Sequence, residues 1–139
     1  MENKNIRFSL VKISTDQFAI IPGSFKIGEA VNFKTGLKFG SDKASKLISV
    51  KASFQFEQQT IPFLIVEASC FFKIEPNDWN GFVLEGEIIV PKSIITHFSM
   101  LTVGTVRGIL HAKTEGTNFN GFVIPTINVA ELVTSDVRM

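Results

Sequence analysis

The sequence predicts an α+β fold: a four-stranded antiparallel sheet followed by a long helix and a short C-terminal helix. Apolar and polar residues alternate along most of residues 6–74, as they do in half-buried strands. An apolar segment with helical spacing follows Pro91. The length of 139 residues fits a single domain, residues 1–139, with a core of its own.

Four segments have the two-residue period of strands. They are residues 6–21, with a kink or bulge near Asp16, and residues 31–39, 48–56 and 61–74. The short connections favour an antiparallel meander, in which each strand pairs with the next. The fourth segment is apolar on both faces, which is typical of a strand that is covered on both sides.

A long helix is expected from Pro91 to about Lys113, because proline is well tolerated in a first helical turn. Its apolar side chains span roughly 200° of a helical wheel, more than the arc of about 100° that is usual for a surface helix. Between Lys92 and Arg107 the segment contains no Asp, Glu, Lys or Arg. A single sheet covers only one side of such a helix, so we expect another body to cover the other side.

The simplest cover is a second copy of the chain, in a homo-oligomer that is a dimer or a tetramer. The glycines on the less apolar side of the helix would permit close approach of another backbone. The residues expected at this oligomer interface are His97, Met100, Gly104 and Gly108. The alternative is that the segment after residue 116 folds back over the helix.

The remaining parts of the chain carry weaker signals. Residues 79–90 are expected to form a connection with some extended structure, because Asn80-Gly81 is a hairpin-type pair. Asn128 and Glu131 indicate a capping box for a short helix at residues 129–134. The tail from Ser135 is expected to be frayed.

Several classes of function are not expected. The net charge of +1 provides no basic excess for nucleic acid. His97 and His111 are fourteen residues apart, or roughly 21 Å along a helix, so they could not share a metal ion. Cys70 lies in an apolar run that favours an inert thiol, and no nucleophile or phosphate-loop motif is present. We therefore expect no enzyme, no catalytic residue, no metal and no cofactor.

The location of the protein is also an expectation from sequence. The chain contains no run of about 18 apolar residues, so membrane insertion is not expected. Residues 1–5 lack the apolar block of a signal peptide. A single cysteine fits a reducing compartment. These observations favour a cytoplasmic protein.

The order and lengths of the expected elements resemble the SecB family of export chaperones over residues 5–134. The matching residues lie at the start of the long helix, near its end and in the segment before the last helix: Pro91, Arg107-Gly108, Phe122-Val123-Ile124-Pro125, Ile127-Asn128 and Glu131-Leu132. The resemblance implies a dimer of dimers with its long helices held between two eight-stranded sheets. It also implies binding of unfolded polypeptides along apolar grooves and their delivery to the translocase motor.

The chain departs from this family in its charge. SecB is strongly acidic, whereas this chain is near neutral. Ile65 occupies the position that best matches the acidic motor-contact residue of the family, and Glu67 lies two residues on. Coupling to an export motor is therefore the part of the family's function that the sequence supports least.

We expect a SecB-like molecular chaperone that binds unfolded or apolar polypeptide segments and could act in protein export. The alternative is a SecB-fold binding subunit that is dedicated to one partner, such as a toxin–antitoxin or phage-related component, and is not coupled to export. The candidate polypeptide-binding residues are apolar residues near the long helix and the connection before it: Trp79, Phe82, Leu84, Phe98, Met100 and Leu101.

Overall fold

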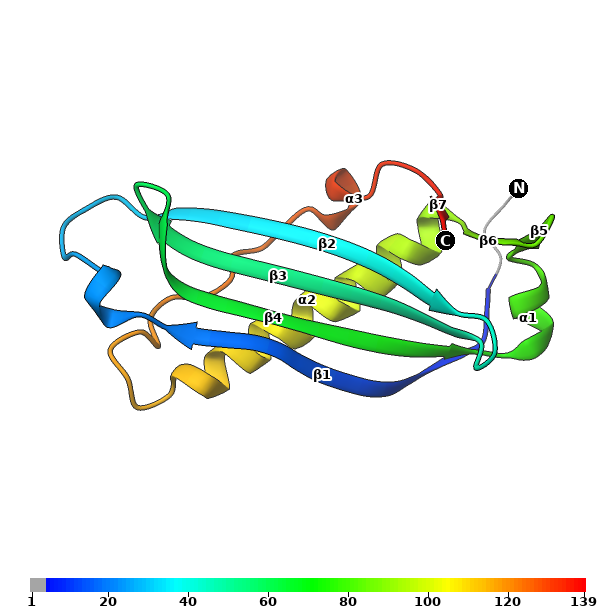
Figure 1. Cartoon of the computed structure of the whole chain (residues 1–139), viewed down its shortest axis with the longest axis horizontal. Helices are drawn as coiled ribbons and strands as arrows, with labels where there is room; N and C mark the ends of the chain where they lie inside the picture. Colours follow the sequence, from blue (N-terminus) through cyan, green and yellow to red (C-terminus); the bar gives the residue numbers. More distant parts are fainter. Residues whose placement is uncertain (1–4) are drawn as a thin grey trace.

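A four-stranded sheet with the long helix α2 packed across one face forms the body of the structure, a computed structural model that describes residues 5–139 (Figure 1). This architecture confirms the predicted α+β fold. The larger elements are β1 (Phe8–Ile20), β2 (Asn32–Asp42), β3 (Leu47–Gln58), β4 (Ile61–Ile74) and α2 (Lys92–Thr114). The smaller ones are η1 (Pro22–Ser24), α1 (Pro76–Asn80), β5 (Val83–Leu84), β6 (Glu87–Val90), α3 (Val129–Leu132) and β7 (Val137–Arg138). Residues 1–4, which enter the expectation about a signal peptide, lie outside the described residues.

The strand order is β1-β4-β3-β2, and each neighbouring pair is antiparallel. The predicted meander is therefore correct for β2, β3 and β4 and wrong for β1. Residues 21–31 carry the chain past the end of the sheet, so that β2 begins at the far edge (Figure 1). A simple meander would have left β4, the most apolar strand, at an edge, whereas β1 now covers that edge.

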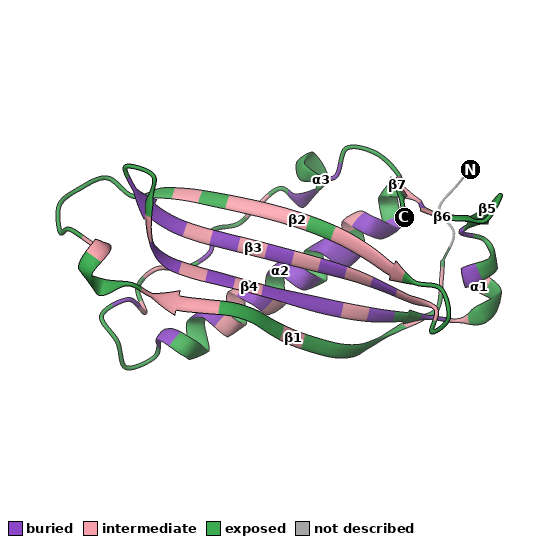
Figure 2. Cartoon of the chain, viewed as in Figure 1, coloured by how far each residue is buried: buried purple, intermediate pink, exposed green. Residues whose placement is uncertain are grey.

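The core lies between the sheet and α2. Alternate side chains of β3 and β4, from Ile48 to Phe56 and from Leu64 to Phe72, are buried on the helix side (Figure 2). Phe98 of α2 stacks on Phe72, with ring centroids 4.2 Å apart and planes at 7°. Complete burial of one such aromatic side chain contributes about 1.5–3 kcal/mol.

A second aromatic cluster closes the other end of the domain. Phe25, from the connection between β1 and β2, lies 4.9 Å from Phe63 of β4, centroid to centroid. Phe122, from the segment after α2, lies 5.1 Å from the Phe63 ring. These rings attach the connection and the segment after α2 to the same end of the sheet.

The face of the sheet that points away from α2 is largely polar. Asp16, at a bulge in β1, accepts hydrogen bonds from Ser14 Oγ at 2.9 Å and Ser69 Oγ at 2.6 Å. Lys51 Nζ lies 3.8 Å from the same carboxylate. The bulge confirms the predicted kink near Asp16. The expected cover of β4 is present on the α2 side, while Ile65 on the other face is only half-buried.

The end of the chain differs from the prediction. The tail expected to be frayed forms β7, which pairs with β6, because partners for its backbone lie about fifty positions earlier in the chain. The short helix ends at Leu132, and the Asn128 side chain makes no capping hydrogen bond. The connection before α2 contains a short helix as well as the β5–β6 hairpin, because Glu75 caps the first turn of α1 through the backbone N–H of Asn77 at 2.8 Å.

Candidate binding surface

One side of α2 is covered by neither the sheet nor any other element among residues 5–139. We call this strip the open side of α2. Its residues are His97, Met100, Leu101, Gly104, Gly108 and His111, all of which are exposed. Met100, just outside the predicted apolar arc, is 57% exposed, and Leu101, at one edge of the arc, is 40% exposed. The other residues of the arc are buried or, at Ile109, half-buried. The arc predicted from the sequence is therefore wider than the part that this chain covers by itself.

The segment after α2 covers one flank of the helix. Arg107 Nε donates to the carbonyl oxygen of Ile124 at 2.9 Å, and its Nη2 donates to that of Pro125 at 2.9 Å. Ile124 is buried as a result. The alternative in which this segment folds back over the helix is thus correct for one flank, and the open side of α2 remains uncovered.

A groove runs between α2 and this folded-back segment. It has a volume of about 410 Å³ and is lined by Gly104, Arg107, Gly108, His111, Phe122 and Val123. A Cβ added at either glycine would meet no atom of a neighbouring element within 4 Å. Because the Arg107 guanidinium is already engaged by two carbonyl groups, the walls favour an apolar occupant over an anion.

The opposite flank of α2 faces an uncovered part of β1. Leu10 and Ile13 are exposed, yet their cross-strand partners in β4 are buried under α2, so both side chains lie on the helix face of the sheet. The helix contacts β1 near both ends of the strand, through Phe98 at Phe8 and through Lys113 at Phe18. Leu10 and Ile13 therefore lie between these two contacts and extend the apolar surface sideways from α2.

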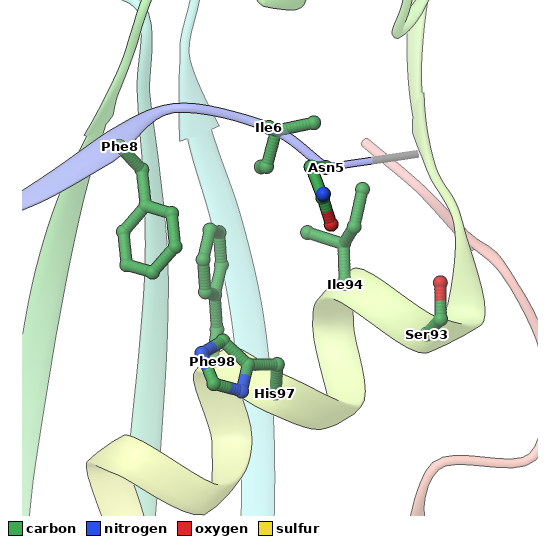
Figure 3. A pocket seen from close by; sticks show the side chains of 7 residues that line it. All are labelled: Asn5, Ile6, Phe8, Ser93, Ile94, His97 and Phe98. Carbon is green, nitrogen blue, oxygen red and sulfur yellow. The ribbon is translucent and has the colours of Figure 1, made fainter. Parts of the chain in front are cut away.

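A second hollow lies at the start of α2 (Figure 3). Its volume is about 430 Å³. Its lining residues come from the segment before β1, the first residue of β1 and the first two turns of the helix: Asn5, Ile6, Phe8, Ser93, Ile94, His97 and Phe98. The His97 ring meets the Phe8 ring edge-on at 5.8 Å. The hollow combines apolar walls with an amide, a hydroxyl and an imidazole, a composition suited to holding an apolar side chain beside a polar backbone.

Among residues 5–139, no group of three or more His, Cys, Asp and Glu side chains could hold a metal ion. α2 is long and apolar enough to cross a membrane by length and composition alone, with a mean hydropathy of 1.2. In the structure it packs on the sheet, and 39% of the apolar window is buried; a core helix of a soluble protein meets the same criterion.

The predicted site residues divide into two groups. Leu84, Met100 and Leu101 are exposed, whereas Trp79, Phe82 and Phe98 are buried in the core, and Phe98 also lines the hollow at the start of α2. Met100 and Leu101 lie together on the open side of α2, while Leu84 lies in β5, beyond the start of the helix (Figure 1).

The four residues predicted for an oligomer interface, His97, Met100, Gly104 and Gly108, all lie on the open side of α2, and the oligomer itself stays a prediction. Sequence reasoning missed Leu10, Ile13 and Val123. Their only signal was that they are apolar, which did not distinguish them from the core.

Comparison with known proteins supports the fold. No family model matches the chain, and no curated protein matches it by sequence. A similar solved structure is the SecB-like chaperone Rv1957 of Mycobacterium tuberculosis in complex with a ChAD peptide from the Rv1956 HigA1 antitoxin. The likeness has a TM-score of 0.52 at 10% sequence identity, and it covers 88% of this chain and 91% of the other. The chain therefore has a SecB-like α+β fold.

Proposed function

We propose that this chain is a non-enzymatic binding protein that holds an apolar segment of one dedicated protein partner along the open side of α2. The observation that carries the proposal is a set of exposed apolar side chains on and beside the open side of α2, next to the groove lined by Gly104 and Gly108. The set consists of Leu10, Ile13, Met100, Leu101 and Val123, contributed by β1, α2 and the segment after α2. The opposite face of the sheet is largely polar, as the cluster of Asp16, Ser69 and Lys51 shows.

The size of this surface fits an extended segment better than a small molecule. Its side chains are spread over three elements, and the groove floor at Gly104 and Gly108 is open to a backbone. Complete burial of a Leu or Met side chain contributes about 1.5–3 kcal/mol. Two or three such side chains therefore supply useful affinity, part of which offsets the ordering of the segment.

The structural neighbour favours a dedicated partner over a general client. That SecB-like chaperone was solved with a peptide from an antitoxin, which is a segment of a specific protein. An export role has no comparable support here: the outer face of the sheet presents lysines such as Lys34, Lys38 and Lys51 as well as carboxylates. We therefore favour binding of a dedicated partner over coupling to an export motor.

Leu101→Asp is expected to abolish binding of the partner, because it puts a charge in the middle of the surface that must become apolar and dry. Chains carrying Leu101→Asp, Ile27→Asp or no substitution would be compared for stoichiometric co-purification of a partner from host cells. Ile27 is the matched control, since it is exposed and apolar but lies in the connection between β1 and β2.

We expect one protein to be retained by the unsubstituted chain and by Ile27→Asp and lost from Leu101→Asp. Aggregation of a chemically unfolded, unrelated protein gives the complementary measurement. Equimolar suppression of that aggregation, without one preferred partner, would contradict the dedicated function and favour a general chaperone.

We also propose that a second copy of the chain shares the open side of α2, and Gly104→Leu tests this. The substitution is expected to leave the fold intact, because a Cβ at Gly104 meets nothing within 4 Å, and leucine is the better helix former. The added side chain would hold another backbone away, so light scattering should show a smaller mass. Gly121→Leu, at an equally open position outside the strip, is the control. An unchanged mass for Gly104→Leu would show that the glycine is not at an interface.

A further inference from the structure

The segment at residues 136–139 occupies an edge of the small sheet. β7 runs antiparallel to β6, and β5 lies on the other side of β6 (Figure 1). The Met139 N–H donates to the carbonyl of Ile88 at 2.8 Å, and the Ile88 N–H donates back to that of Met139 at 3.4 Å. The backbone of this segment thus completes a sheet whose central strand, β6, comes from the connection before α2.

The first residue of the segment caps the long helix. Asp136 Oδ1 accepts a hydrogen bond from the backbone N–H of Lys92 at 2.8 Å. Lys92 is the first residue of α2, and the residue before it is Pro91, whose side chain has no acceptor. A carboxylate is favoured at this position, because the free N–H groups of a helix start carry partial positive charge.

The other side chains of the segment have contacts of their own. Arg138 forms an ion pair with Glu87 of β6, and both side chains are exposed. Val137 and Met139 are half-buried against the core. In chain order, the segment therefore presents an acid, an apolar residue, a base and an apolar residue to a surface that matches each of them.

These contacts hold the segment weakly, while β6 itself is anchored firmly. β7 is two residues long, and a solvated ion pair contributes little stability. By contrast, Ile88 and Val90 are fully buried, and the Ile89 N–H donates to the Phe82 carbonyl at 2.8 Å. Detachment of the segment would leave β6 in place with unpaired backbone groups, which is a template for another extended strand.

We propose that the edge of β6 is a recognition site for an extended protein segment of the pattern acid–apolar–base–apolar, and that residues 136–139 are its resident occupant. A partner segment enters by displacing them. The inference deepens the proposed function and rests on it, since the competing segment belongs to the protein partner. It adds a second point of contact, next to the hollow of Figure 3, because Ser93 and Ile94 of that hollow directly follow the capped residue Lys92.

The resident segment also sets a threshold for binding. Because it is tethered, it competes at an effective concentration on the order of millimolar. A passing apolar polypeptide therefore does not displace it, whereas a partner that also contacts the open side of α2 does. Competition from the resident segment thereby favours one matched partner over many weakly binding polypeptides.

Arg138→Glu in the full chain is the test, because it replaces the ion pair with two neighbouring carboxylates and so shifts the weakly held segment toward its detached state. The probe is a synthetic peptide with the sequence of residues 134–139, Thr-Ser-Asp-Val-Arg-Met. Its affinity would be measured by NMR titration of the ¹⁵N-labelled chain. We expect the peptide to bind the Arg138→Glu chain at least on the order of tenfold more tightly than the unsubstituted chain. The substitution should speed hydrogen exchange at the Ile88 amide, and the bound peptide should slow it.

The charge-swapped chain Glu87→Arg/Arg138→Glu is the matched control: it should keep its own segment and reject the peptide. Equal affinity for the unsubstituted and Arg138→Glu chains would overturn the proposal, and so would absence of binding to Arg138→Glu. The Leu101→Asp substitution separates this site from the open side of α2. It should leave the peptide's affinity for the Arg138→Glu chain unchanged, even if the proposed function fails.

Discussion

Phe98→Ala is expected to lower the free energy of unfolding by about 3–5 kcal/mol, which is the usual range for an aromatic ring removed from a core. The Phe98 side chain is 0% exposed. Its ring stacks on Phe72 at 4.2 Å and meets Phe8 at 4.8 Å, so it joins the helix to a central strand and to an edge strand at once. Removing it leaves a cavity between α2 and the sheet that neither side fills without moving.

Met100→Ala provides the matched control, two positions further along the same helix. Met100 is mostly exposed, so its truncation is expected to change the free energy of unfolding by less than about 0.5 kcal/mol. Urea denaturation of both variants, with linear extrapolation to water, makes the comparison. Similar small losses would mean that Phe98 lies on a surface, as its prediction as a polypeptide-binding residue assumed.

This pair of residues shows why the sequence predicts the helix better than its site. An apolar arc of roughly 200° identifies α2 as a helix that is covered on more than one side. The same width removes the information about which part of the arc faces the sheet: Phe98 and Leu101 both lie within it, yet Phe98 is buried, whereas Leu101 is exposed like Met100. The exposed positions of Gly104 and Gly108 were easier to predict, since small residues contribute little to a core.

Strand order required information that local patterns do not contain. Alternation along β3 assigns each residue to one face of the sheet, whichever strands lie beside β3. The apolar residues from Ile48 to Phe56 are buried on one face, as the alternation predicts. The partner of β1 depends instead on the path of residues 21–31, which is fixed by the packing of Phe25 against Phe63. That contact joins residues nearly forty positions apart, and no local pattern reveals it. With only the short connections to go on, the sequence suggested a meander.

The apolar residues of the candidate surface were hidden for a similar reason. Leu10 and Ile13 continue the alternation of β1 and point to the helix face of the sheet, as core residues do. They are exposed only because β1 is an edge strand that α2 does not cover along its middle. A sequence pattern identifies the face of a strand, whereas exposure here depends on the width of the layer above it.

Arg107→Ala is expected to lower the free energy of unfolding by about 2–3 kcal/mol, because two charge-assisted hydrogen bonds to backbone carbonyls are lost together. These bonds, to Ile124 and Pro125, fasten the segment after α2 to the helix. Hydrogen exchange at the amides of residues 122–124 and 126–127 should therefore rise more than exchange in β3. A uniform rise across the chain would contradict a local clamp.

Arg107→Lys separates geometry from charge. A lysine keeps the charge but presents a single ammonium group, so it cannot reproduce the fork that reaches two successive carbonyls, and we expect it to recover only part of the loss. Lys92→Ala is the control, since Lys92 is an exposed cation of the same helix and its bond to Asp136 uses only the backbone N–H.

The Arg107-Gly108 pair acquires a physical meaning from this arrangement. The arginine pins the folded-back segment to one flank of α2, and the glycine beside it keeps the groove open. Full recovery of stability in Arg107→Lys would show that charge alone, without the fork, holds the segment in place.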